Sequence, residues 1–167
     1  MNENTRNLAV SGLATALNIV LMFLSSYIQI NTLAFLFLGS VLSAIVLLET
    51  NKRYAVICFV ATSILCVLLI PDKQMVFYYI LFFGWYPLLK LLAESRRNRI
   101  VEWIIKLAAF HIILVIGGAL FYWLFHINLL ETGFTVWLIW PASVVIFVLL
   151  DILLSFGIYF YIRKRKK

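Results

Sequence analysis

Ionisable side chains are rare inside the long apolar runs of this chain, and two of them can exchange protons. Asp151 lies twelve residues before Arg163, and His111 lies twelve residues after Arg99. At a helical rise of 1.5 Å per residue, each is about 18 Å along its helix from a basic residue. If the two helices are antiparallel, the carboxylate and the imidazole lie at one depth and can share a proton. We therefore predict an intramembrane polar pair of His111 and Asp151.

Three roles fit such a pair: a proton relay, a hinge lock between two conformations, or a hydrogen-bonded contact that holds two helices in register. A buried carboxylate needs a partner. Lys106 and Lys90 are alternative partners for Asp151. Both lysines are closer to a run end and can also extend toward the membrane surface.

Catalytic and metal-binding motifs are absent from the sequence. There is no HExxH or GxSxG motif, and Asp151 is the sole acidic residue well inside an apolar run, so an aspartate pair is excluded. His111 and His126 are fifteen residues apart, and Cys58 and Cys66 share one run, so none forms a close ligand set. We predict no enzyme activity, no metal and no cofactor.

The elements that position these residues are apolar runs of membrane-spanning length. Hydrophobic residues make up 65% of the 167 residues and charged residues only 13%, against about 25% in soluble domains. A span needs about 20 apolar residues, with about 17 to 25 workable. We predict an all-α integral membrane protein, a six-helix transmembrane bundle forming a single domain over residues 1–167, with spans at 8–28, 32–48, 54–70, 75–93, 103–125 and 134–162.

Basic residues alternate between the loops. They occur at Arg6, in the second-to-third loop, in the fourth-to-fifth loop and in the five-residue basic tail, whereas the other three connections hold only Lys73. The positive-inside rule then places both termini in the cytoplasm. This placement also explains the net charge of +7 without a nucleic-acid partner.

Polar and aromatic residues gather near the three non-basic connections, which this orientation places outside. Amide, carboxylate and aromatic side chains suit a small, flat, partly polar ligand. The predicted substrate-binding residues are Gln29, Asn31, Tyr78, Tyr79, Trp85, Asn128, Glu131, Trp137 and Trp140. Taken alone, each aromatic residue is also explained by interfacial anchoring or by packing in the core.

Small residues recur at a spacing of four on the first span. Gly12 and Ala16 form one such pair, and Ser11 and Thr15 form another. Small residues at this spacing let a second helix approach closely, either within the bundle or from a partner protein.

Asn18 lies one turn after Ala14 on this face of the first span, and we expect it to hydrogen-bond across helices. On the fourth span, the sequence Gly-Trp-Tyr-Pro at residues 84–87 predicts a break in the helix.

With Leu8-Ala-Val-Ser-Gly-Leu-Ala-Thr-Ala-Leu17 on its first span, the chain resembles the substrate-binding S components of energy-coupling factor transporters. The resemblance covers the size, the six spans and the orientation. It implies uptake of a vitamin or other micronutrient across the bacterial plasma membrane. It further implies that Gly12 and Ala16 dock against a coupling transmembrane subunit, which works with two cytoplasmic ATPases. The first docking position departs from the alanine of the family but stays small.

A second family offers an alternative. The chain is similar in size and helix layout to the membrane proteins that determine rod shape in bacteria and recruit wall-synthesis enzymes. Such a scaffold would use Gly12, Ala16 and the basic face for protein contacts and would need no outer pocket.

Overall fold

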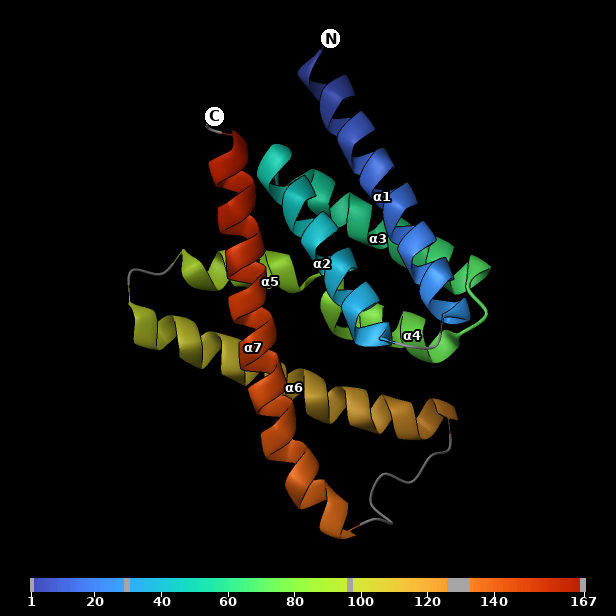
Figure 1. Ribbon diagram of the computed structural model, residues 1–167, viewed down its shortest axis with the longest axis vertical. Helices are drawn as coiled ribbons and strands as arrows, with labels where there is room; N and C mark the ends of the chain where they lie inside the picture. Colours follow the sequence, from blue (N-terminus) through green and yellow to red (C-terminus); the bar gives the residue numbers. More distant parts are fainter. Residues whose placement is uncertain (1, 29–30, 96–97, 126–132, 166–167) are drawn as a thin grey trace. The chain divides into compact units, whose positions relative to one another are not determined.

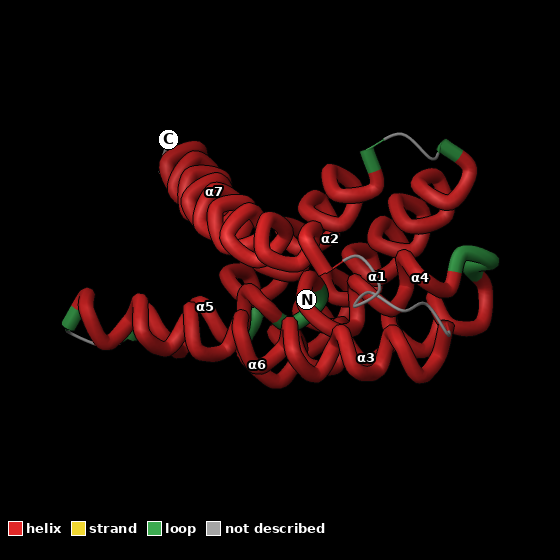
Figure 2. The backbone as a smooth tube through the Cα atoms, turned by 90° about the horizontal axis from the view of Figure 1, so that it is seen from below, coloured by secondary structure: helices red, strands yellow, loops and turns green. Residues whose placement is uncertain are grey.

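The computed structural model describes residues 2–28, 31–95, 98–125 and 133–165, and every element in these ranges is a helix (Figures 1 and 2). In chain order they are α1 (Glu3–Tyr27), α2 (Thr32–Glu49), α3 (Lys52–Leu69), α4 (Lys73–Tyr78), the π-helix η1 (Tyr79–Phe83), α5 (Tyr86–Glu94), α6 (Arg99–Phe125) and α7 (Gly133–Arg165).

Six helical segments are long and apolar enough to cross a membrane, which confirms the predicted fold class. They are α1, α2, α3, the segment Lys73–Glu94 that contains α4, η1 and α5, most of α6, and α7 from Trp140. Predicted and observed bounds agree within a few residues, although α1 begins at Glu3 and not at Leu8. The cytoplasmic orientation of the termini stays a prediction.

The chain divides into two compact units, residues 1–97 and 98–167. We call them the N-terminal unit and the C-terminal unit. Each is described by itself, and the prediction of one domain over residues 1–167 stays a prediction.

In the N-terminal unit, α1 packs against α2 and α3, and α2 also packs against α3, η1 and α5. The buried face of α1 is small and polar, whereas its exposed positions include many large apolar residues. This is the inverse of a soluble amphipathic helix, and it suits a helix that faces lipid on the outside. The buried residues of α1 are Asn7, Ser11, Ala14, Asn18, Met22 and Ser25.

Side chains close several helix ends of this unit. The Asn51 side chain accepts hydrogen bonds from two backbone N–H groups at the start of α3, and Asp72 does the same for α4. The Lys73 Nζ donates to the carbonyls of Val67, at 2.6 Å, and Ile70, at 2.8 Å. Helix ends leave such groups without intrahelical partners, so these contacts fix the α3–α4 connection.

The fourth span is irregular at its centre. The Gly84 N–H donates to the Tyr79 carbonyl at 2.8 Å, five residues back, which is the π-helical register. Pro87 then lies in the first turn of α5, where a missing N–H costs nothing. The sequence predicted a break over residues 84–87, and the irregularity begins five residues earlier, at Tyr79.

In the C-terminal unit, α6 and α7 cross and do not pack along their whole length (Figure 1). The contacts run in antiparallel order. Lys106 meets Asp151, and the Phe110 and Phe147 rings stack with centroids 4.5 Å apart. These two pairs fix the register of the crossing.

Candidate functional site

Four uncharged polar side chains from four different elements meet inside the N-terminal unit. They are Asn18 of α1, Ser43 of α2, Thr62 of α3 and Tyr79 of η1, and we call them the polar cluster. Asn18, Thr62 and Tyr79 are fully buried. A polar group buried inside a membrane-spanning bundle is a candidate functional residue because lipid offers it no hydrogen bond.

Gly39 of α2 brings two members of the cluster together. A Cβ at this position would lie 2.9 Å from Asn18 Oδ1 and 3.5 Å from the ring of Tyr79. A side chain here would displace the flexible ends of Met22 and Asn18, so the glycine allows their close approach to α2. The hydroxyls of Ser43 and Thr62 are the other polar neighbours of the Tyr79 hydroxyl.

Most polar atoms of the cluster have no partner in the described part of the chain. Asn18 Nδ2 and Oδ1, Thr62 Oγ1 and the Tyr79 hydroxyl are buried without a hydrogen bond of accepted geometry. Ser43 Oγ donates to the Gly39 carbonyl at 3.1 Å. Each orphaned group costs about 1–3 kcal/mol, and native folds keep few of them. By hydrogen-bond geometry the cluster therefore keeps unused donors and acceptors, and the Ser43 and Thr62 hydroxyls lie near enough to the Tyr79 hydroxyl to interact with it.

The members of the polar cluster lie at different depths around the middle of their spans. Tyr79 is six residues from Lys73 at the α3–α4 end, about 9 Å at a helical rise of 1.5 Å per residue, whereas Ser43 is six residues from Glu49 at the opposite end. The cluster is therefore central in the N-terminal unit, and the positive-inside rule predicts that its α3–α4 end lies outside the cell.

The predicted substrate-binding residues separate in the structure. Tyr79 is fully buried in the polar cluster, whereas its neighbour Tyr78 is 41% exposed. Successive helical residues point about 100° apart, so the two side chains face different surroundings, and their joint role in one pocket stays a prediction. The Trp85 indole N–H donates to the Leu81 carbonyl of its own span at 2.8 Å. Trp140 is 41% exposed on α7.

The remaining predicted substrate residues lie elsewhere or outside the described chain. Asn31 is exposed, has a left-handed backbone with φ of 69°, and borders a shallow groove of about 340 Å³ whose other lining residues, Ile28, Ala34, Phe35 and Leu38, are apolar. Gln29, Asn128 and Glu131 lie outside the described residues, and so does the side chain of Trp137.

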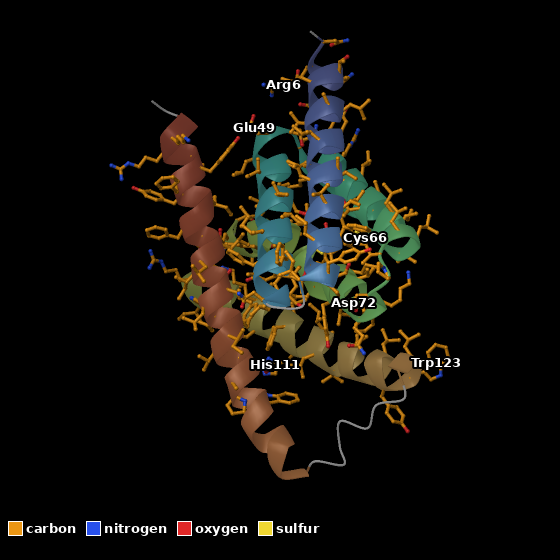
Figure 3. The ribbon with its side chains drawn as sticks, turned by 45° about the vertical axis from the view of Figure 1, so that its right-hand side comes forward. Arg6, Glu49, Cys66, Asp72, His111 and Trp123 are labelled. Carbon is orange, nitrogen blue, oxygen red and sulfur yellow. The ribbon has the colours of Figure 1, made fainter. Side chains whose placement is uncertain are left out.

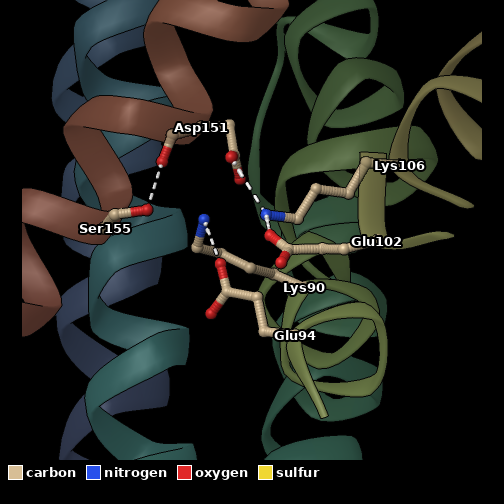
Figure 4. A network of polar contacts seen from close by, with 6 residues as sticks. All are labelled: Lys90, Glu94, Glu102, Lys106, Asp151 and Ser155. Atoms are coloured by element: carbon tan, nitrogen blue, oxygen red, sulfur yellow. Dashed lines mark hydrogen bonds and ion pairs between the residues drawn. The ribbon is translucent and has the colours of Figure 1, made fainter. Parts of the chain in front are cut away.

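The predicted pair of His111 and Asp151 does not form a hydrogen bond. Lys106 Nζ lies 3.1 Å from Asp151 Oδ2 and 2.7 Å from Glu102 Oε1, so Asp151 takes one of the alternative partners (Figure 4). His111 Nδ1 bonds to the Leu107 carbonyl at 2.7 Å, and its ring lies 5.5 Å from that of Trp140.

The register of the α6–α7 crossing explains this correction. The prediction assumed that residues at equal distances from Arg99 and Arg163 face each other. In an antiparallel pair, this assumption pairs residues whose numbers sum to 262. The observed pairs of Lys106 with Asp151 and Phe110 with Phe147 sum to 257. The five-residue offset is about 7 Å along a helix, too far for the imidazole and carboxylate to meet.

The two small-residue pairs of α1 face different surroundings. Ser11 is buried, and the Thr15 hydroxyl contacts Cys58 Sγ of α3 at 3.3 Å. Gly12 and Ala16 are exposed, and no described atom lies within 4 Å of a Cβ built on Gly12. Within the described chain, only the first pair serves packing.

Sequence reasoning missed two members of the cluster, Ser43 and Thr62. Their hydroxyls carry little signal because a helical Ser or Thr can bond back to its own helix. Asn18 was recognised as a buried polar residue, with an expected bond across helices that the structure does not contain. The Asn18 amide cannot bond back to its own helix as a Ser or Thr hydroxyl does, so Asn18 gave the clearer indication of the cluster in the sequence.

Comparison of the chain with protein-family models, with curated protein sequences and with solved structures gives no match.

Proposed function

We propose that this chain is the non-catalytic, substrate-binding membrane subunit of a bacterial energy-coupling factor importer for a vitamin or other small micronutrient. Both termini lie in the cytoplasm, where two ATPases act through a coupling transmembrane subunit. The observation that carries the proposal is the polar cluster of Asn18, Ser43, Thr62 and Tyr79, with its buried and unpartnered atoms.

A binding subunit gives these orphaned groups a use. A ligand can form the hydrogen bonds that the folded chain leaves unmade. These bonds offset the free-energy cost of burying unpaired polar groups. A scaffold that acts only through its outer surfaces has no such need.

The exposed pair of Gly12 and Ala16 supports the partner in this proposal. A smooth, unpacked strip on a lipid-facing helix lets another transmembrane helix approach at close range. The same observation favours the second candidate, a rod-shape scaffold, because that function also needs an open docking face. The identity of the partner separates the two.

The test is affinity purification of the full chain from native membranes in mild detergent, followed by mass spectrometry. A coupling transmembrane subunit with two ATPases is the expected result. Wall-synthesis enzymes in their place would instead establish the scaffold.

The docking face is tested with Gly12→Leu and Ala16→Leu in the same purification. Each adds an isobutyl group where close helix approach is needed, so recovery of the partner should fall at least tenfold. Gly118→Leu is the matched control, since Gly118 also has no described neighbour within 4 Å of an added Cβ but lies on α6. Unchanged recovery with both α1 variants would place the docking face elsewhere.

A further inference from the structure

The electrostatic surroundings of the polar cluster restrict what it can bind. The groups that act on the Tyr79 hydroxyl are the side chains of Ser43, Thr62, Cys58 and Cys66, and none of them is charged at neutral pH. The other close neighbours are Met22, beside Gly39, and the Phe59 ring, 6.4 Å from that of Tyr79. No Lys, Arg, Asp or Glu contributes to this set.

The charged residues at the α3–α4 connection of the N-terminal unit are engaged elsewhere. Lys73 donates to two carbonyls at the end of α3, and Asp72 caps α4. Toward the opposite end, Lys90 pairs with Glu94 at 2.8 Å on its own helix. An ionised group entering the cluster would therefore be buried without a counter-ion, which costs far more than burying a neutral amide or hydroxyl.

The orphaned atoms define the complementary chemistry. Asn18 offers an N–H donor and a carbonyl acceptor, while Thr62 and Tyr79 each offer a hydroxyl that donates or accepts. An amide, lactam or polyol matches such a set, and the aromatic and sulfur neighbours suit a flat ring.

We infer that the polar cluster of Asn18, Ser43, Thr62 and Tyr79 binds the uncharged, hydrogen-bonding part of a small molecule. This inference rests on the proposed function and adds the chemical class of its substrate. There is little free space beside Gly39, because a Cβ on it would lie 2.8 Å from Met22 Cε. Binding therefore requires flexible side chains such as Met22 to move, and a ligand stabilises the conformation in which they have moved.

The test uses three nearly isosteric variants of the full chain: Asn18→Leu, Thr62→Val and Tyr79→Phe. Each removes orphaned polar atoms with little change of volume. Ser26→Ala is the matched control, since this half-buried serine donates only to the carbonyl of Phe23 on its own helix. Two quantities are measured on each purified protein: the small molecules released on denaturation, by mass spectrometry, and the midpoint of thermal unfolding.

The wild type and Ser26→Ala should release a compound that is neutral at pH 7, and the three cluster variants should release at least tenfold less. Their unfolding midpoints should be unchanged or higher, because an unsatisfied group has been removed. Lower midpoints in all three would show a structural network, with or without bound water, and would overturn the inference. Equal release from the wild type and the cluster variants would overturn it as well.

Benzamide and benzoate serve as a matched pair of probes, equal in shape and different in charge. Saturation-transfer NMR at millimolar probe should show binding of benzamide to the wild type, a signal at least fivefold weaker for benzoate, and loss of the benzamide signal in Asn18→Leu. Absence of both a released compound and a benzamide signal overturns the inference.

The inference and the proposed function fail in different ways. A released compound that is ionised at pH 7, together with a copurified coupling subunit, overturns the inference and leaves the proposed function standing. Recovery of wall-synthesis enzymes without any released compound overturns both.

Discussion

The two units bury polar groups between their helices in different ways. In the N-terminal unit the buried polar residues are mostly uncharged, and the charged side chains that join different helices, Arg6 and Lys73, bond backbone carbonyls near helix ends, Arg6 that of Glu49 at 3.2 Å (Figure 3). In the C-terminal unit one lysine, Lys106, is bonded to a carboxylate on each of two helices. Of the residues in an apolar window of each span, 33% are buried in α2 but only 12% in α6.

The two units therefore hold their helices together through different kinds of contact. Small residues let the helices of the N-terminal unit approach closely, so many weak contacts add up. The helices α6 and α7 only cross, and a few strong contacts define their register. We expect stability to be spread over many residues in the first unit and concentrated at the crossing in the second.

The largest effect should come from the ion pair at the crossing. Replacing Lys106 with Met leaves the carboxylates of Asp151 and Glu102 without this partner, and losing one member of a buried pair costs about 3–5 kcal/mol. The free energy of unfolding in detergent, measured by denaturant titration, should fall by that amount. The double variant Lys106→Met/Asp151→Leu should recover part of the loss, because it also removes one of the unpaired carboxylates. Equal losses in the single and double variants would show that the crossing does not depend on this charge pair.

An intermediate effect is expected where helices approach most closely. A Cβ on Gly84 would lie 2.6 Å from two ring carbons of Phe59, so Gly84→Ala should lose about 1–3 kcal/mol through overpacking. Gly118→Ala in α6 meets no described atom within 4 Å and should be neutral or gain up to about 1 kcal/mol from helix propensity. Thermal unfolding of the two variants compares the packing of the units directly. Similar unfolding midpoints for the two variants would contradict the difference in packing between the N-terminal and C-terminal units.

The smallest effect should come from a single uncharged contact of the N-terminal unit. The Thr15 hydroxyl bonds to the Ser11 carbonyl at 2.9 Å and contacts Cys58 Sγ at 3.3 Å. Thr15→Val should cost about 0.6 kcal/mol, the average for such contacts in membranes. The same denaturant titration measures it, with Ser63→Val as a second member of the class, since Ser63 Oγ bonds only to the Phe59 carbonyl of its own helix. A loss above about 2 kcal/mol for Thr15→Val would mean that stability is concentrated in this unit too.

The sequence by itself determined the helices. Six apolar runs of spanning length predicted six helical segments, and the proline and glycine over residues 84–87 marked the irregular fourth span. These features are local: backbone hydrogen bonds close within one segment, and lipid leaves no alternative to a helix. Asn18 stood out for the same reason, as an amide where water is absent.

The tertiary structure decided which faces meet. On α1 the Ser11 and Thr15 pair is used in packing while Gly12 and Ala16 stay exposed, and on the fourth span Tyr79 and not Tyr78 points inward. Asp151 meets Lys106 because of a five-residue register offset that no residue type encodes. In lipid every helix face is apolar, so hydrophobic periodicity does not distinguish the packed face from the exposed one. Close approach at small residues makes that choice, and it depends on the partner helix as much as on the segment itself.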